Sequence, residues 1–174
     1  MFSIHVTLQA PRTRVVSPRF SAELDDFRSV LHFVCEVLAR EPANAIVVTG
    51  FGLDWRLDIG TDFCALLEQL PSAIQSLRRS SDFQLDFYEQ GVERRLAFRM
   101  TEDDGYLIEC SPMVPSVEWE ARDEVCSREA LLAMLVLVQS QFVSVLQSSF
   151  PVLHRHPWAQ EWLTAGGSDG QPER

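Results

Sequence analysis

Three segments in which large apolar residues recur at every second position follow one another between residues 83 and 110 of the sequence. Phe83, Leu85 and Phe87 alternate with polar residues, and the same period of two recurs over 95–100 and 106–110. This period is typical of strands with one buried face. The intervening Glu102–Gly105 segment ends in an Asp-Gly pair, which favours a tight hairpin turn. The segment is therefore predicted to form an antiparallel meander.

The remaining elements place the chain in the α+β class. Alternating or β-branched residues predict further strands over 2–9, 45–49 and 53–59, with a glycine-containing hairpin between the last two and shorter candidates at 15–16 and 117–120. Helical periodicity predicts two long helices and a shorter one. We expect one antiparallel sheet of about 5–7 strands, with helices over about 22–40, 128–149 and 62–79 packed on one face.

The 174 residues fit one domain, which we place at 1–163, followed by a disordered tail over 164–174 that is rich in glycine and polar residues. The N-terminus lacks the continuous apolar run of a secretory signal. The longest apolar run, 130–138, is about half as long as a membrane span. The four cysteines form no close pair, which favours reduced thiols. These features predict a cytoplasmic protein.

The net charge of −10 comes from 25 acidic residues and 15 basic ones, and all the basic residues are arginines. Nucleic acid and anionic membranes are poor partners for such a chain, because binding to either requires cationic side chains. Thirteen acids and five arginines lie between residues 82 and 129, a local net charge of −8. A partner protein with a basic surface fits this charge, and so does simple solubility.

Few residues are arranged for chemistry. His154 and His156 stand two apart with no further ligand nearby, so packing or capping explains them better than a metal does. Gly50–Gly52 leads into a strand instead of a helix, which favours a turn over a phosphate loop. Cys64 is better explained as a core residue than as a nucleophile. We expect no cofactor, no metal site and no catalysis.

Acidic side chains and one tryptophan at the turns and outer faces are the candidate partner-binding residues. Carboxylates would steer a cationic surface, and an aromatic anchor would supply affinity. The alternative is a solvated acidic surface over a buried tryptophan. The candidates are Asp54, Asp58, Asp86, Glu89, Glu93, Glu102, Asp103, Asp104, Glu118, Trp119 and Glu120.

The stretch Trp55–Asp62, together with Asp86–Gly91 and Arg94, resembles segments of small bacterial immunity proteins that are encoded beside polymorphic toxins. The resemblance covers roughly residues 45–163. It implies a protein that covers the active site of a cognate toxin and has no chemistry of its own. It makes the acidic turns around Glu89 and Asp103 candidate toxin-facing groups.

Three functions stay open from the sequence. The first is an immunity-type inhibitor that binds a toxin domain one to one. The second is an acidic secretion chaperone that acts as a homodimer on an effector client. The third is an enzyme whose site is assembled from scattered residues such as His5, Asp54, Arg56 and Asp58.

Overall fold

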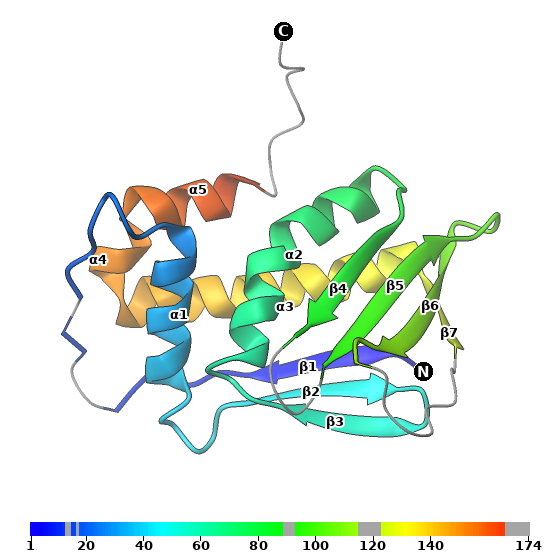
Figure 1. The fold of residues 1–174 in the computed structure, drawn as a ribbon, viewed down its shortest axis with the longest axis horizontal. Coiled ribbons are helices and arrows are strands. Elements are labelled where there is room, and N and C mark those ends of the chain that lie inside the picture. The colour runs from blue at the N-terminus through cyan, green and yellow to red at the C-terminus, as the bar shows by residue number, and fades with distance from the viewer. Residues whose placement is uncertain (13–14, 17, 89–92, 115–122, 166–174) are drawn as a thin grey trace, which may run out of the picture.

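The computed structural model describes residues 1–12, 15–16, 18–88, 93–114 and 123–165. These residues form two antiparallel sheets and five helices (Figure 1). The elements in chain order are β1 (Ser3–Thr7), α1 (Phe27–Leu38), β2 (Ala45–Gly50), β3 (Leu53–Leu57), α2 (Asp62–Arg78), β4 (Phe83–Phe87), β5 (Arg94–Met100), β6 (Gly105–Pro112), β7 (Asp123–Ser127), α3 (Arg128–Ser149), α4 (Pro151–His154) and α5 (Pro157–Ala165).

The N-terminal sheet has the strand order β1-β2-β3, and the meander sheet has the order β4-β5-β6-β7. The predicted meander is confirmed, with Leu96 paired to Leu85 on one side and to Cys110 on the other. The predicted hairpin after β2 is also confirmed. Its tip needs left-handed backbone, with φ of 58° at Phe51 and 76° at Gly52.

The α+β class and the antiparallel pairing are confirmed, but the expectation of one sheet with helices on one face is wrong. The seven strands divide into two sheets because α2 lies between β3 and β4 in the chain and packs against β4 (Figure 1). Strands β1 and β4 present their outer edges to helices, so these edges are not available to join the sheets. At Ile4 the backbone N–H points to the sulfur of Met134, and at Asp86 the backbone meets the amide of Gln69.

Helix α1 begins at Phe27, about five residues later than predicted. Ser21 directly precedes the predicted start and could cap a helix there, but Asp26 is the observed cap, and Asp26 and Ser29 form a reciprocal capping box. The stretch before Asp26 forms a separate turn in which Asp25 N–H donates to the Ser21 carbonyl at 2.9 Å. Leu24, which lies inside the predicted helix, is therefore 88% exposed.

Helix α2 is the predicted 62–79 helix, and it continues through Pro71 without ending. A proline inside a helix has no N–H, so the carbonyl of Leu67, four residues earlier, loses its intrahelical donor. The indole Nε1–H of Trp162 in α5 donates to that carbonyl at 2.8 Å. Because Trp162 and Leu67 are both buried, the docking of α5 satisfies a carbonyl that the proline would leave unpaired.

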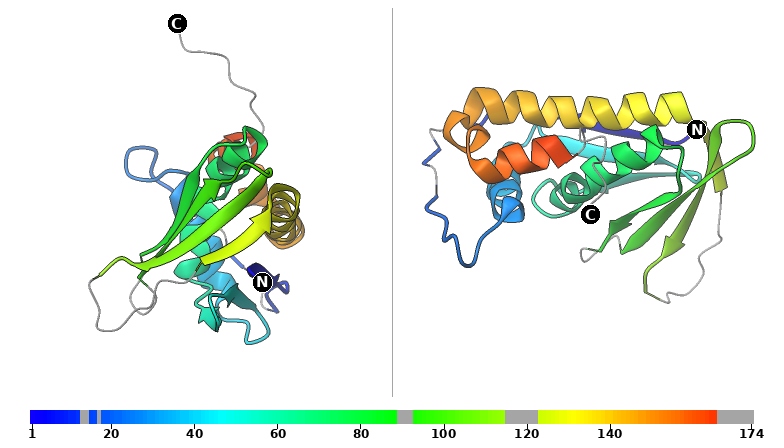
Figure 2. Two further views of the ribbon diagram at one scale, coloured as in Figure 1. Left: turned by 90° about the vertical axis from the view of Figure 1, so that its right-hand side faces the viewer. Right: turned by 90° about the horizontal axis from the view of Figure 1, so that it is seen from above.

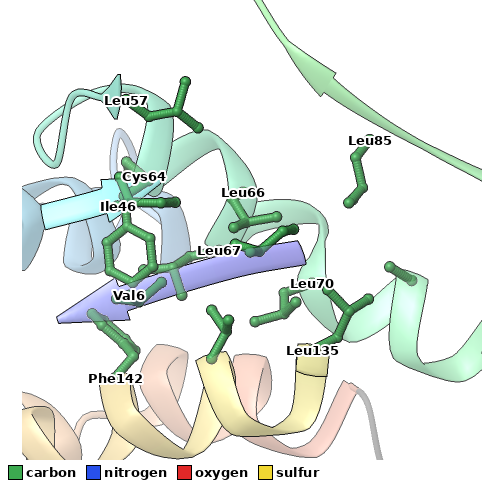
Figure 3. Close-up of a cluster of buried hydrophobic side chains, with 14 of the residues drawn as sticks. Val6, Ile46, Leu57, Cys64, Leu66, Leu67, Leu70, Leu85, Leu135 and Phe142 are labelled. Carbon is green, nitrogen blue, oxygen red and sulfur yellow. The ribbon is translucent and has the colours of Figure 1, made fainter. Parts of the chain in front are cut away.

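Helix α3 matches its predicted bounds of 128–149, and Ser127 caps it by accepting a hydrogen bond from Ala130 N–H. Leu135 and Phe142 of α3 pack towards Leu67 and Leu70 of α2 in the core (Figure 3). The helix runs along one flank of the molecule, and its opposite face points to solvent (Figure 2).

One of the two short predicted strands is wrong, because residues 15 and 16 are described and belong to no strand. The other, at 117–120, lies outside the described residues and stays a prediction. The fourth described strand of the meander sheet is β7. A further short helix near the C-terminus, α5, ends at Ala165, and 166–174 also lie outside the described residues.

Candidate partner-binding surface

The turn between β5 and β6 carries three of the candidate acids, Glu102, Asp103 and Asp104, and all three are exposed. Thr101 N–H donates to the Gly105 carbonyl at 2.9 Å and closes the turn. Asp104 has a φ of 56°, a left-handed conformation that aspartate tolerates better than most residues. The predicted Asp-Gly turn is therefore confirmed.

Asp104 differs from its two neighbours because it is paired. Arg128, the first residue of α3, donates two hydrogen bonds to the Asp104 carboxylate at 2.7 and 3.0 Å. The hydrogen bond from Arg128 lowers the pKa of Asp104 below its ordinary value. Glu102 and Asp103 form no ion pair with any described residue, so the tip of this hairpin keeps two uncompensated charges.

Two further acids lie beside this tip. The Asp82 carboxylate accepts a hydrogen bond from Met100 N–H at 2.8 Å, which places it at the same end of the sheet. Glu129 follows Arg128 and is exposed. Sequence reasoning missed both, although the pairing of β4 with β5 could have indicated Asp82. We call Asp82, Glu102, Asp103 and Glu129 the acidic tip.

Asp86 lies on the exposed face of the meander sheet and is already neutralised. Arg95, directly opposite on β5, donates to its carboxylate at 2.7 and 2.8 Å. This contact raises the pKa of Arg95. A second pair, Arg99 with Glu109 at 3.0 Å, lies on the same sheet. Oppositely charged cross-strand pairs stabilise a solvated face and leave little net charge there.

Asp54 and Asp58 belong to the N-terminal sheet and do not join the acidic tip. Asp58 Oδ1 accepts hydrogen bonds from the backbone N–H and the hydroxyl of Thr61, at 2.9 and 3.1 Å. These contacts fix the turn into α2, so Asp58 has a structural role. Asp54 is exposed on the edge strand β3.

Glu93 lies at the end of β5 remote from the acidic tip. Seven residues of β5 separate it from the turn, roughly 23 Å at about 3.3 Å per residue. Its carbonyl accepts a hydrogen bond from Met113 N–H at 2.7 Å. Glu89, Glu118, Trp119 and Glu120 lie outside the described residues. Of the seven candidate residues that the structure describes, it therefore brings together the three acids of the β5–β6 turn.

The residues considered for chemistry are dispersed or buried. Within the described ranges, no group of three or more His, Cys, Asp or Glu side chains could hold a metal ion. The His156 ring packs 4.7 Å from that of Trp158, in agreement with a packing role. Cys64 is buried at 4% exposure, and its sulfur lies 4.0 Å from a Glu68 carboxylate oxygen.

The residues of the enzyme alternative lie on or directly beside the N-terminal sheet, and none of them lines a described hollow. His5 pairs with Val47, and Val47 pairs with Arg56, so the first and last stand two strands apart, roughly 10 Å at about 4.8 Å per strand. The largest described hollow, about 480 Å³, lies elsewhere, between α1, Glu68 and residues 18–25.

Among the described residues, α3 is the one helix long and apolar enough to cross a membrane, judged by length and composition alone. A core helix meets the same criterion, and six residues of α3, among them Leu135 and Phe142, are buried in the core.

Fold and surface together define an α+β protein with two antiparallel sheets and an acidic hairpin tip. A scan against models of protein families, a comparison with curated proteins and a comparison with solved structures find no match to this chain.

Proposed function

We propose that this protein is an immunity-type inhibitor that binds a cognate bacterial toxin domain and neutralises it by protein–protein contact. The observation that carries the proposal is the acidic tip. Glu102 and Asp103 project from a closed hairpin turn and have no described arginine to neutralise them. Because the turn that carries them is closed and exposed, they can meet cations on another molecule.

The surrounding structure supports such a role, because the tip is held in place. Asp104 anchors the turn to α3 through Arg128, and Arg128 N–H also reaches the Asp104 carbonyl at 3.3 Å. A surface that is already ordered loses little conformational entropy on binding. Exposed charges on it act mainly on the association rate and on the choice of partner.

The first test is genetic. The product of the neighbouring gene is expressed in a bacterium alone, and then together with this protein. We expect growth arrest in the first case, rescue in the second, and copurification of the two proteins as a one-to-one complex. A neighbouring product that is harmless without this protein would contradict the proposal.

The second test measures the charge of the tip. The variant E102Q/D103Q removes two charges, and the control E23Q/E161Q removes two exposed charges from the segment before α1 and from α5, elements remote from the β5–β6 turn (Figure 1). We expect the tip variant to associate with the toxin about three- to tenfold more slowly at low salt, with the difference shrinking at high salt. Equal rates for the two variants at low salt would show that the tip faces away from the toxin.

A second candidate function, the homodimeric secretion chaperone, is favoured by one observation on α3. The segment 130–149 contains no charged residue, and its outer face exposes Val136 at 37% and Leu137 at 57%. An acidic chain can meet a second copy across such a face without like-charge repulsion. Light scattering discriminates the two functions, because a tight homodimer favours the chaperone and a monomer favours the inhibitor.

A further inference from the structure

The two sheets have four outer edges, and helices protect two of them with side chains. On β1, Ile4 N–H points to the Met134 sulfur of α3 at 3.0 Å. On β4, the amide of Gln69 in α2 both accepts from Asp86 N–H and donates to its carbonyl, each at 2.8 Å. These contacts stand where a neighbouring strand would bind, and they close both edges to another chain.

The edge of β3 is closed at one end. The buried carboxylate of Asp62 accepts a hydrogen bond from Asp58 N–H at 2.9 Å, and the Asp58 carbonyl accepts one from Phe63 N–H. The exposed side chains along the same edge, Asp54 and Arg56, carry opposite charges. Charged side chains on an edge strand discourage pairing with another strand.

The backbone directions of β7 follow from the register of the meander. The hydrogen bond from Thr101 N–H shows that Gly105 turns its backbone groups towards β5. In an antiparallel ladder, consecutive residues turn these groups to alternate sides. Tyr106 and Ile108 therefore face β7, and they pair there with Cys126 and Glu124.

The same alternation directs the backbone N–H and carbonyl groups of Asp123 and Val125 away from the sheet. Among the residues that the structure describes, the N–H and carbonyl groups of Asp123 and Val125 have no hydrogen-bond partner on that side. The Val125 side chain is 67% exposed. Strand β7 is therefore the described edge on which no helix side chain binds the outward backbone groups. Unlike β3, it also exposes an apolar side chain, that of Val125, in the middle of the strand.

We propose that the outer edge of β7 takes up an extended, arginine- or lysine-bearing segment of the partner as an added strand. The inference rests on the proposed function, because it names how the toxin would be held. Backbone hydrogen bonds to Asp123 and Val125 would supply the pairing, and the exposed Val125 side chain would contact an apolar residue of the incoming strand.

The charge around this edge selects a basic strand. Asp123 is exposed at one end of β7, and Ser127 at the other end pairs with Gly105 beside the acidic tip. The two described cations that adjoin β7 are already paired, since Arg128 binds Asp104 and the N-terminal ammonium of Met1 binds Glu124. A second copy of this chain is a poor occupant of this edge. Its own Asp123 and acidic tip would come close to those of the first copy, and like charges in such contacts repel.

The test uses the full chain and an acetylated, amidated hexapeptide in which arginine and valine alternate. Amide hydrogen exchange is followed by NMR as the peptide is added. We expect the Val125 amide to exchange about tenfold more slowly at saturation, while the Cys126 amide, already bonded to β6, changes little. The control peptide has the same side chains and charge but a methyl group on every backbone nitrogen, so it cannot donate strand hydrogen bonds.

A pair of variants of the protein also tests whether the peptide binds through backbone hydrogen bonds to β7. Val125→Pro removes an outward N–H without breaking a bond to β6, and Val125→Thr keeps that N–H. We expect the proline variant to bind the peptide about tenfold more weakly and the threonine variant to bind within about twofold of the original.

Equal affinity for the methylated peptide, or unchanged exchange at Val125, would overturn the added strand. Either result would leave the inhibitor proposal standing, since toxin rescue and the E102Q/D103Q rates do not depend on this edge. If Val125→Pro does not fold, the exchange measurement on the original chain decides alone.

Discussion

The contact between Pro71 and Trp162 leads to a prediction that a double-mutant cycle can test. Trp162→Phe removes the indole N–H that reaches the Leu67 carbonyl at 2.8 Å, and Leu67 is fully buried. Pro71→Ala restores a backbone N–H four residues after Leu67, in position to donate to the same carbonyl. The two substitutions should therefore compensate for each other.

The magnitude follows from the cost of an unsatisfied buried carbonyl, about 1–3 kcal/mol. Trp162→Phe alone also loses ring area and part of its edge-on contact with Phe142, whose centroid lies 5.5 Å away. That packing loss is the same in the Pro71→Ala background, so it cancels in the cycle. We expect the phenylalanine substitution to cost about 1–3 kcal/mol less when residue 71 is alanine.

The assay measures the free energy of unfolding of the original chain, the two single variants and the double variant. Each is titrated with urea and followed by far-ultraviolet circular dichroism, because that signal reports the helices and does not depend on the tryptophan that is replaced. Trp162→Phe must cost clearly more in the original background than in the Pro71→Ala background. Equal costs in the two backgrounds would refute the reasoning, because they would show that the indole N–H does not replace the missing helix donor.

Three further predictions concern the core, the turn into α2 and an ion pair. Leu135→Ala should lower the free energy of unfolding by about 2–5 kcal/mol, whereas Leu137→Ala on the exposed face of α3 should change it by less than about 0.5 kcal/mol in the same titration. Asp58→Ala should cost about 1 kcal/mol, and Asp58→Asn, which keeps the accepting oxygen, should restore most of that stability. Arg128→Met should raise the pKa of Asp104 to its ordinary range in an NMR titration. Because the pKa of Asp104 is lower in the folded state, the pair stabilises the fold at pH values above the carboxyl's ordinary pKa. That stabilisation is lost as the pH falls through the lowered pKa. An Asp104 pKa that Arg128→Met leaves unchanged would contradict the assignment.

Local patterns predicted the individual elements well where one periodicity dominated. The alternation at 83–87 and 106–110 and the Asp-Gly turn predicted the antiparallel meander, and its register came from the structure. Helix α3 agrees with the predicted range of about 128–149, because Ser127 caps its start and Phe150–Pro151 ends it. At α1, two capping residues competed, and the reciprocal bond between Asp26 and Ser29 decided the start.

The division into two sheets could not be read from periodicity. It depends on which strand edges remain available, and single long-range contacts close them. Gln69 is an ordinary polar residue on a helix in the sequence, but in the fold its amide pairs with the backbone of Asp86. Period-two patterns specify the face that a strand buries and say nothing about its edges.

The candidate site was only partly predictable for a similar reason. The local net charge of −8 counts residues along the chain, whereas the potential depends on which charges pair in space. Arg95 neutralises Asp86 and Arg128 neutralises Asp104, whereas no described arginine neutralises Glu102 or Asp103 at the β5–β6 turn. Cross-strand register could have indicated the first pair, but nothing local joins residue 104 to the first residue of α3.

The Arg128–Asp104 pair has two opposite effects on binding, and its removal separates them. Arg128→Met deletes a cation beside the acidic tip and frees the Asp104 carboxylate, so a basic partner should associate faster at low salt. The same change unties the turn from α3, so the tip must be ordered on binding and the complex should dissociate faster. Stopped-flow association rates across a salt series and dissociation rates by competition measure the two effects independently. Faster association with unchanged dissociation would show that the pair supplies charge balance alone, and that the turn is already rigid without its anchor.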